Sequence, residues 1–165
     1  MRKLAVVVLS VTCAITMSSC GVVSSVISGL LEPRKTFKEI VGERLSLDLS
    51  SAEVLEEWDT HGGFHGDGEA FLKLAVPDGF ETRLSIEETV DGKVEEGWRA
   101  LPLTGIAYAY YYEWGGLFEH PETGERVIPE IVNGYWYYTE TGAMNWDLVI
   151  LDVDENILYF YEWDA

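Results

Sequence analysis

The densest group of chemically capable side chains lies in the segment DTHGGFHGDGE, residues 59–69. Side chains at alternate positions of an extended chain point to the same face. Imidazole nitrogens and carboxylate oxygens gathered in this way could hold zinc or another divalent ion. A neighbouring glutamate, Glu57 or Glu69, could then act as a base on a metal-bound water, which defines a hypothesis of a metal-dependent hydrolase. The candidate ligands all stand at odd-numbered positions: Asp59, His61, His65 and Asp67.

A structural interpretation of the same segment is better supported. Its four glycines allow successive tight turns, because glycine adopts positive φ without a steric cost. Aspartate side chains in such a loop accept hydrogen bonds from its amides. The spacing of His61 and His65 matches that of metalloprotease helices, but no glutamate follows the first histidine and the glycines disfavour a helix. We therefore predict a hairpin loop fastened by its own side chains, with no catalytic residue assigned and no cofactor required, and keep the divalent-metal site as the alternative.

The segments around this loop predict the sheet that positions it. Residues 69–76 alternate apolar and polar side chains and are typical of a strand, whereas residues 53–59 fit a helix or a strand. Aromatic and β-branched runs predict three further strands, and the second of them is apolar on both faces, which favours a central position for residues 146–153. The class is therefore α+β, with a mainly antiparallel sheet of about five strands. The three later strands are expected at residues 134–140, 146–153 and 157–163.

Two or three helices are expected beside this sheet. Thr36 can cap a helix over residues 37–43, with Phe37, Ile40 and Val41 on one face. A second helix is expected over residues 80–92, with Phe80 and Leu84 facing inward. A third is expected after Thr104, with an apolar face of Ile106, Tyr110 and Trp114, and residues 119–130 are expected to form an acidic surface loop.

The beginning of the chain has the layout of a secretory signal. A basic start is followed by an apolar run and small polar residues before Cys20. The sequence MSSC, residues 17–20, resembles the lipobox of bacterial lipoproteins, although Met17 stands where leucine is commonest. In such proteins the cysteine is diacylated on sulfur and becomes the new N-terminus, and an ordinary cleaved signal is the alternative. We expect a signal peptide over residues 1–19, a lipidated tether over residues 20–35 and one domain over residues 36–165.

Charge and cysteine content limit the partners of this domain. Cys13 and Cys20 are the only cysteines, so no disulfide is expected in the folded part. Removal of residues 1–19 takes away Arg2 and Lys3 but no acidic residue, which leaves 9 basic and 29 acidic residues and a net charge near −20. Such a charge repels nucleic acid and favours cations or a basic partner. The expected partners are the membrane, through the lipid on Cys20, and a cell-wall component or a basic protein at the extracellular face.

Other kinds of site have less support. Tyrosines and tryptophans at residues 108–114 and 135–138 could stack on sugars, but aromatic side chains are also ordinary material for strands and cores. His120 lies in a loop and is expected at the surface. The sequence contains no GxSxG stretch and no phosphate-binding glycine loop of the P-loop or dinucleotide type.

Four segments, in the order DTHGGFHGDG, WRALPL, IPEIVNGYW and ILYFYEWDA, are similar to a family of uncharacterised lipoproteins and short hypothetical proteins from Gram-positive bacteria. The similarity covers most of residues 37–165, and the loop between Tyr138 and Trp146 is shorter here than in that family. The resemblance implies an α+β domain outside the membrane. It supplies no activity, cofactor or catalytic residue.

Overall fold

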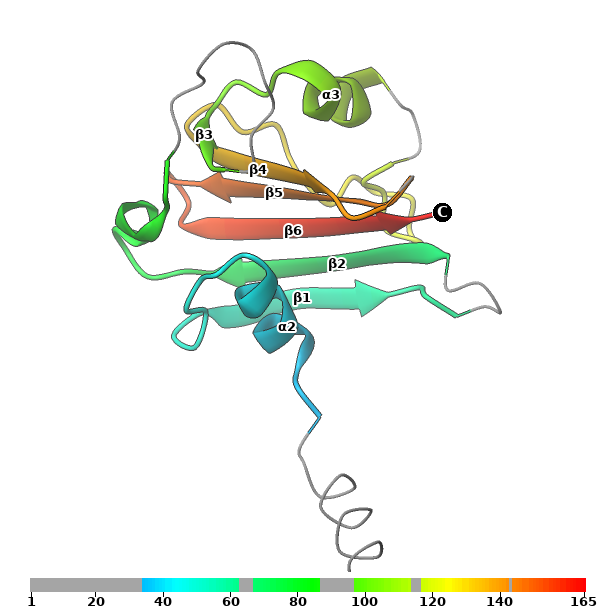
Figure 1. The fold of residues 1–165 in the computed structure, drawn as a ribbon, viewed down its shortest axis with the longest axis horizontal. Helices are drawn as coiled ribbons and strands as arrows, with labels where there is room; N and C mark the ends of the chain where they lie inside the picture. Colours follow the sequence, from blue (N-terminus) through cyan, green and yellow to red (C-terminus); the bar gives the residue numbers. More distant parts are fainter. Residues whose placement is uncertain (1–33, 63–66, 87–96, 114–116, 143) are drawn as a thin grey trace, which may run out of the picture. The chain divides into compact units, whose positions relative to one another are not determined.

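One antiparallel sheet of six strands forms the centre of the structure (Figure 1). The computed structural model describes residues 34–62, 67–86, 97–113, 117–142 and 144–165. The predicted α+β class and the antiparallel sheet are confirmed, but the strand count is six rather than about five. The additional strand has only two residues, too few to show an alternating pattern in the sequence. The strands are β1 Glu53–Asp59, β2 Gly68–Ala75, β3 Arg99–Ala100, β4 Gly134–Glu140, β5 Trp146–Asp152 and β6 Ile157–Asp164.

The strand order β1-β2-β6-β5-β4-β3 brings together segments that are far apart in the sequence. Strand β2 pairs with β6 from Gly68 opposite Asp164 to Ala75 opposite Ile157. Strand β5 lies between β6 and β4, and six of its seven residues are buried, which confirms its predicted central position. The first residue of β2, which follows the β1–β2 loop, therefore lies beside the C-terminal end of β6.

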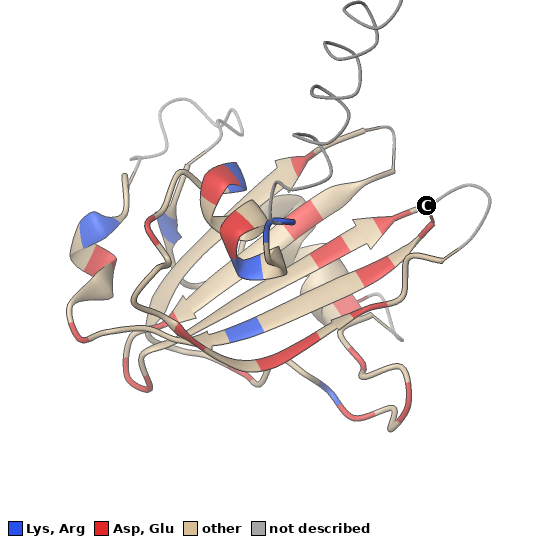
Figure 2. Cartoon of the chain, turned by 90° about the horizontal axis from the view of Figure 1, so that it is seen from below, with Lys and Arg blue, Asp and Glu red and all other residues tan. Residues whose placement is uncertain are grey.

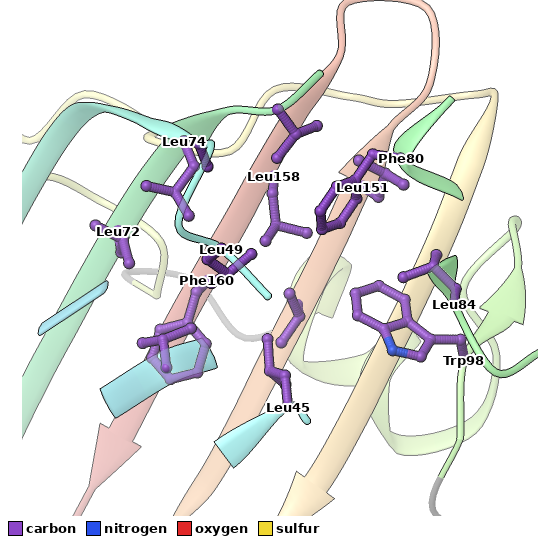
Figure 3. Close-up of a cluster of buried hydrophobic side chains, with 14 residues drawn as sticks. Leu45, Leu49, Leu72, Leu74, Phe80, Leu84, Trp98, Leu151, Leu158 and Phe160 are labelled. Carbon is purple, nitrogen blue, oxygen red and sulfur yellow. The ribbon is translucent and has the colours of Figure 1, made fainter. Parts of the chain in front are cut away.

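One face of the sheet is covered by helix α2, Phe37–Arg44, and by the segments that follow η1, a 3₁₀ helix over Phe80–Arg83 (Figure 3). The predicted cap at Thr36 is present and forms a full capping box, since Thr36 and Glu39 each accept a hydrogen bond from the other's backbone N–H. Val41 is fully buried, but Ile40 is 40 % exposed, so the predicted apolar face of this helix was wrong at that position. The core on this face includes Leu45, Leu49, Leu72, Leu74, Phe80, Leu84, Trp98, Leu151, Leu158 and Phe160.

The opposite face is covered by helix α3, Gly105–Tyr108, by a π-helical turn η2, Ala109–Glu113, and by part of residues 117–131. The buried positions are Ala107 and Tyr111, whereas Ile106 is 41 % exposed, which corrects the predicted face of Ile106, Tyr110 and Trp114. The α-helical part has four residues and then widens into a π turn, so a regular helical period does not extend over the segment. Trp114 lies outside the described residues.

Two other predictions for irregular segments need correction. The helix expected over residues 80–92 is a 3₁₀ turn that ends at Arg83, after which Leu84 is extended and Ile86 bridges to Trp98. Phe80 and Leu84 do face inward, as predicted, and residues 87–96 lie outside the described part. The loop over residues 119–130 is not purely a surface segment, because Ile128 is fully buried in the second core.

The stretch Thr36–Ala165 forms one compact unit. No helix among the described residues has the length and apolar character needed to cross a membrane.

Candidate functional site

The segment nominated by the sequence is the connection of the first hairpin. Strand β1 ends at Asp59 and pairs antiparallel with β2, which begins at Gly68. The pairing continues past Asp59, because Thr60 N–H donates to the Glu69 carbonyl at 2.8 Å and Glu69 N–H donates to Thr60 Oγ1 at 2.8 Å. Residues 63–66, which include His65, lie outside the described part.

Asp59 fastens the start of this loop. Its Oδ1 accepts the backbone N–H of His61 at 2.8 Å and lies 2.6 Å from Nδ1 of the His61 ring. Because an ionised carboxylate only accepts, Nδ1 carries the proton in this contact. The ring packs over Gly68, where a Cβ atom would lie 2.8 Å from the backbone N and Cα of His61. Two of the four nominated residues are therefore joined directly, and glycine at position 68 leaves the space that their arrangement needs.

The strand register places the acidic residues Asp59 and Glu69 on opposite faces of the sheet. Asp59 pairs with Ala70, and Ala70 pairs with Glu162, so these three side chains share the face of the sheet that helix α2 covers. Glu69 points to the opposite face, where its carboxylate accepts a hydrogen bond from the Tyr161 hydroxyl. Burial, followed by this bond to Glu69, raises the pKa of Tyr161. Glu69 is thus engaged on the other side of the sheet from Asp59, and of the two bases proposed from the sequence only Glu57 shares the Asp59 face.

Asp164 lies beside the His61 ring. Its Oδ2 lies 3.4 Å from Nε2 of His61, beyond good hydrogen-bond range, and Nε2 is buried without a hydrogen-bond partner among the described residues. The His61 side chain is 21 % exposed. Sequence reasoning missed Asp164 because only the pairing of β2 with β6 brings the end of the chain beside the loop. The aromatic pattern that predicts β6 carries no information about its neighbour.

The four predicted metal ligands are brought together only in part. Asp59 and His61 are in contact, Asp67 is exposed at the start of β2, and His65 lies outside the described residues. Among the residues that the structure describes, no group of three or more histidine, cysteine or acidic side chains is arranged to hold a metal ion.

A partly buried ion cluster on the same face was not expected from the sequence. Nη1 of Arg44, in the last turn of α2, donates to both carboxylate oxygens of Asp147 at 3.0 and 3.1 Å and to Oε1 of Glu162 at 2.8 Å. Asp147 is completely buried, and this burial raises its pKa to about 6 although the charge of Arg44 acts in the opposite direction. Burial alone would lower the pKa of Arg44, but its bond to Glu162 and the nearby acidic charges raise it. The cluster joins helix α2 to strands β5 and β6.

The aromatic residues considered for sugar stacking divide between core and surface. Tyr111, Trp136 and Tyr138 are buried, whereas Tyr108 and Tyr112 are 45 % and 49 % exposed with ring centroids 4.8 Å apart. His120, which was expected at the surface, is partly buried, with its ring centroid 5.9 Å from that of Trp58, and its Nδ1 accepts the backbone N–H of Glu122 at 3.1 Å.

Acidic side chains are spread over strands, helices and loops of the described structure, with few basic ones between them (Figure 2). An open hollow of about 740 Å³ borders α2 and the turn at residues 46–50. Its Lys38 already donates to the Ala52 carbonyl at 2.8 Å, and its Thr36 and Glu39 form the capping box. Compared with protein-family models, curated proteins and solved structures, the chain matches none of them.

Proposed function

We propose that this protein is an exported lipoprotein, held at the outer side of the cell membrane by lipid on Cys20, whose α+β domain binds or supports an envelope component without catalysis. The observation that carries the proposal is MSSC at residues 17–20, directly after a basic and apolar leader. A diacylglyceryl group supplies two acyl chains, and two chains are what stable membrane attachment requires.

The hairpin loop supports the non-catalytic part of the proposal. Here Asp59 is engaged with His61, and Glu69 is engaged with Tyr161 on the opposite face. These contacts stabilise the loop itself.

Replacement of Cys20 tests the anchoring. In a detergent phase-partition experiment, the wild type should enter the detergent phase. The full-length Cys20→Ala protein should instead stay in the aqueous phase or accumulate as an uncleaved precursor, because it lacks the sulfur that carries the lipid. Cys13→Ala is the matched control, since it removes the other cysteine and should be processed and partitioned like the wild type. A Cys20→Ala protein that still matures and enters the detergent phase would refute the anchor.

A second candidate, a divalent-metal-dependent hydrolase at the HGGFH loop, is favoured by the environment of His61. Asp59 on Nδ1 orients the ring as carboxylates orient metal-binding histidines. The 3.4 Å separation of Nε2 and the Asp164 carboxylate is close to that of two ligands around a tetrahedral zinc ion, about 3.3 Å for bonds near 2.0 Å.

Thermal melts separate the two candidates. If the loop binds metal, zinc should raise the melting temperature of the wild type, a chelator should reverse the rise, and both His61→Ala and Asp164→Asn should abolish it. If the loop is structural, His61→Ala should lower the melting temperature equally with zinc and with chelator.

A further inference from the structure

A second hollow, here called the arginine pocket, lies on the face of the sheet that α2 covers. It has a volume of about 290 Å³ and is bordered by the end of α2, the end of η1 with the segment after it, the two residues before β3, and strand β4. Its polar and aromatic lining consists of Arg44, Ser46, Arg83, Ser85, Trp98 and Tyr137. Small-molecule pockets usually span about 300 to 1,000 Å³, so this one suits a small ligand.

The described lining of this pocket differs from the whole chain in its charged residues. The sequence has 29 acidic and 11 basic residues, yet the described lining contains two arginines and no acidic residue. Arg44 is balanced by Asp147 and Glu162, but each of these bonds uses Nη1, which leaves Nε and Nη2 as donors. Arg83 lies over the Phe80 ring at 5.4 Å and forms no direct ion pair within the described residues. Its charge does reach Asp48, whose pKa is lowered first by hydrogen bonds from Ser50 and then by Arg83. Arg83 therefore supplies a guanidinium group with no direct ion pair among the described residues, and Arg44 supplies additional donors.

Ser46 provides an independent indication. It follows the C-cap residue Leu45 and has φ 55°. Its N–H donates to Glu43, and the next N–H, that of Leu47, donates to Gly42, which is the bonding pattern of a Schellman motif. Glycine is the usual residue at this left-handed position, because other side chains are strained there. A serine at this position is unfavourable for the helix end but places a hydroxyl in the pocket lining.

We propose that the arginine pocket binds the phosphate group of a small soluble phosphomonoester. Guanidinium groups match phosphate oxygens with paired N–H donors, and the serine hydroxyls add donors for the remaining oxygens. Trp98 and Tyr137, with ring centroids 5.8 Å apart, form an apolar wall for the organic part of the ligand. The inference deepens the proposed envelope-binding function by naming a ligand class. Its test does not depend on Cys20, so either one can fail while the other stands.

The test uses inorganic phosphate as the probe and the full-length protein in mild detergent. Melting temperature is followed by near-ultraviolet circular dichroism in phosphate and in chloride of equal ionic strength. Phosphate at ten times its dissociation constant should raise the wild-type melting temperature by about 3 to 6 °C. Arg83→Gln should lose most of this shift. Ser46→Gly should melt higher than the wild type without phosphate, because the backbone strain is relieved, and should respond less to phosphate.

Lys73→Gln is the matched charge control. Its side chain lies 5.6 Å over the Tyr159 ring, away from the pocket lining, so the variant should keep the wild-type response. An equal phosphate shift in the wild type and Arg83→Gln would overturn the proposal, since phosphate also stabilises proteins through exclusion from their surface. Equal stabilisation by acetate would overturn the phosphate assignment. Arg83-dependent binding to phosphatidylglycerol vesicles, without a response to soluble phosphate, would overturn the assignment to a soluble ligand.

Discussion

The Asp59 carboxylate accepts two hydrogen bonds from one residue, the backbone N–H and the ring Nδ1–H of His61. These contacts fix the direction in which the chain leaves strand β1. They are largely accessible to solvent, since 59 % of the Asp59 side chain is exposed, so each contributes modestly.

Replacement of Asp59 by alanine tests this role. Asp59→Ala should lower the free energy of unfolding by about 1 to 2 kcal/mol, because two donors lose their acceptor. Urea denaturation measures the change. Asp67→Ala is the control in the same loop, since Asp67 is exposed and no described hydrogen bond uses its side chain, and its effect should stay within about 0.5 kcal/mol. Equal effects of the two substitutions would contradict a fastening role for Asp59.

The sequence alone indicated that Asp59 and His61 lie close together, because they are two positions apart in a turn. Asp164 and the Arg44–Asp147–Glu162 cluster could not be found in this way. Their partners are separated by about a hundred residues, and they meet only through the strand order and the docking of α2. Sequence patterns identify a strand by its alternation but do not identify its neighbour.

Among the secondary-structure elements, the close approach of β2 to the segment that follows β1 depends on Gly68. A Cβ atom there would lie 2.8 Å from the His61 backbone, and backbone cannot move aside as a flexible side chain can. Gly68→Ala should therefore destabilise the domain by about 1 to 3 kcal/mol in urea denaturation. Gly62→Ala is the matched control, because its Cβ would meet its nearest atom at an ordinary 3.6 Å. A greater loss of stability in Gly62→Ala than in Gly68→Ala would show that the loop has another geometry.

The junction of α2 with β5 and β6 predicts a pH dependence. The folded chain binds a proton on Asp147 more tightly than the unfolded chain does, since burial raises its pKa to about 6. The resulting stabilisation is complete below the ordinary carboxyl pKa, near 4, and is lost as the pH rises through about 6. Over this window the wild type should lose about 3 kcal/mol of unfolding free energy relative to Asp147→Asn, whose amide does not titrate.

Unfolding free energies measured between pH 4 and 8 test this difference. Asp67→Asn is the control, because it removes the same charge at an exposed position and should follow the wild-type curve. Parallel curves for the wild type and Asp147→Asn would mean that Asp147 titrates normally in the folded protein.

Elements with a regular period were predictable, and those without one were not. The strands of residues 134–163 have long alternating or aromatic runs, and α2 begins at a capping box that is visible in the sequence. Strand β3 has two residues, η1 has four, and α3 changes from α to π geometry after Tyr108. Such short elements are determined by packing on the sheet, so local pattern alone misassigned the face at Ile106.

At the scale of the whole molecule, the proposed function joins a lipid anchor to a domain that begins at Thr36. Residues 21–35 separate Cys20 from this domain, and a fully extended chain of that length spans at most about 50 Å. The net charge of −18 opposes adsorption of the chain to anionic headgroups, so the proposed membrane attachment depends on the covalent lipid.

The intact mass of the protein extracted from membranes of a bacterium that expresses the full-length chain tests this attachment most directly. The account predicts a chain that begins at Cys20, with residues 1–19 removed and the added mass of a diacylglyceryl group on that cysteine. A mature chain that begins at any other residue, or that carries no lipid on Cys20, would contradict it.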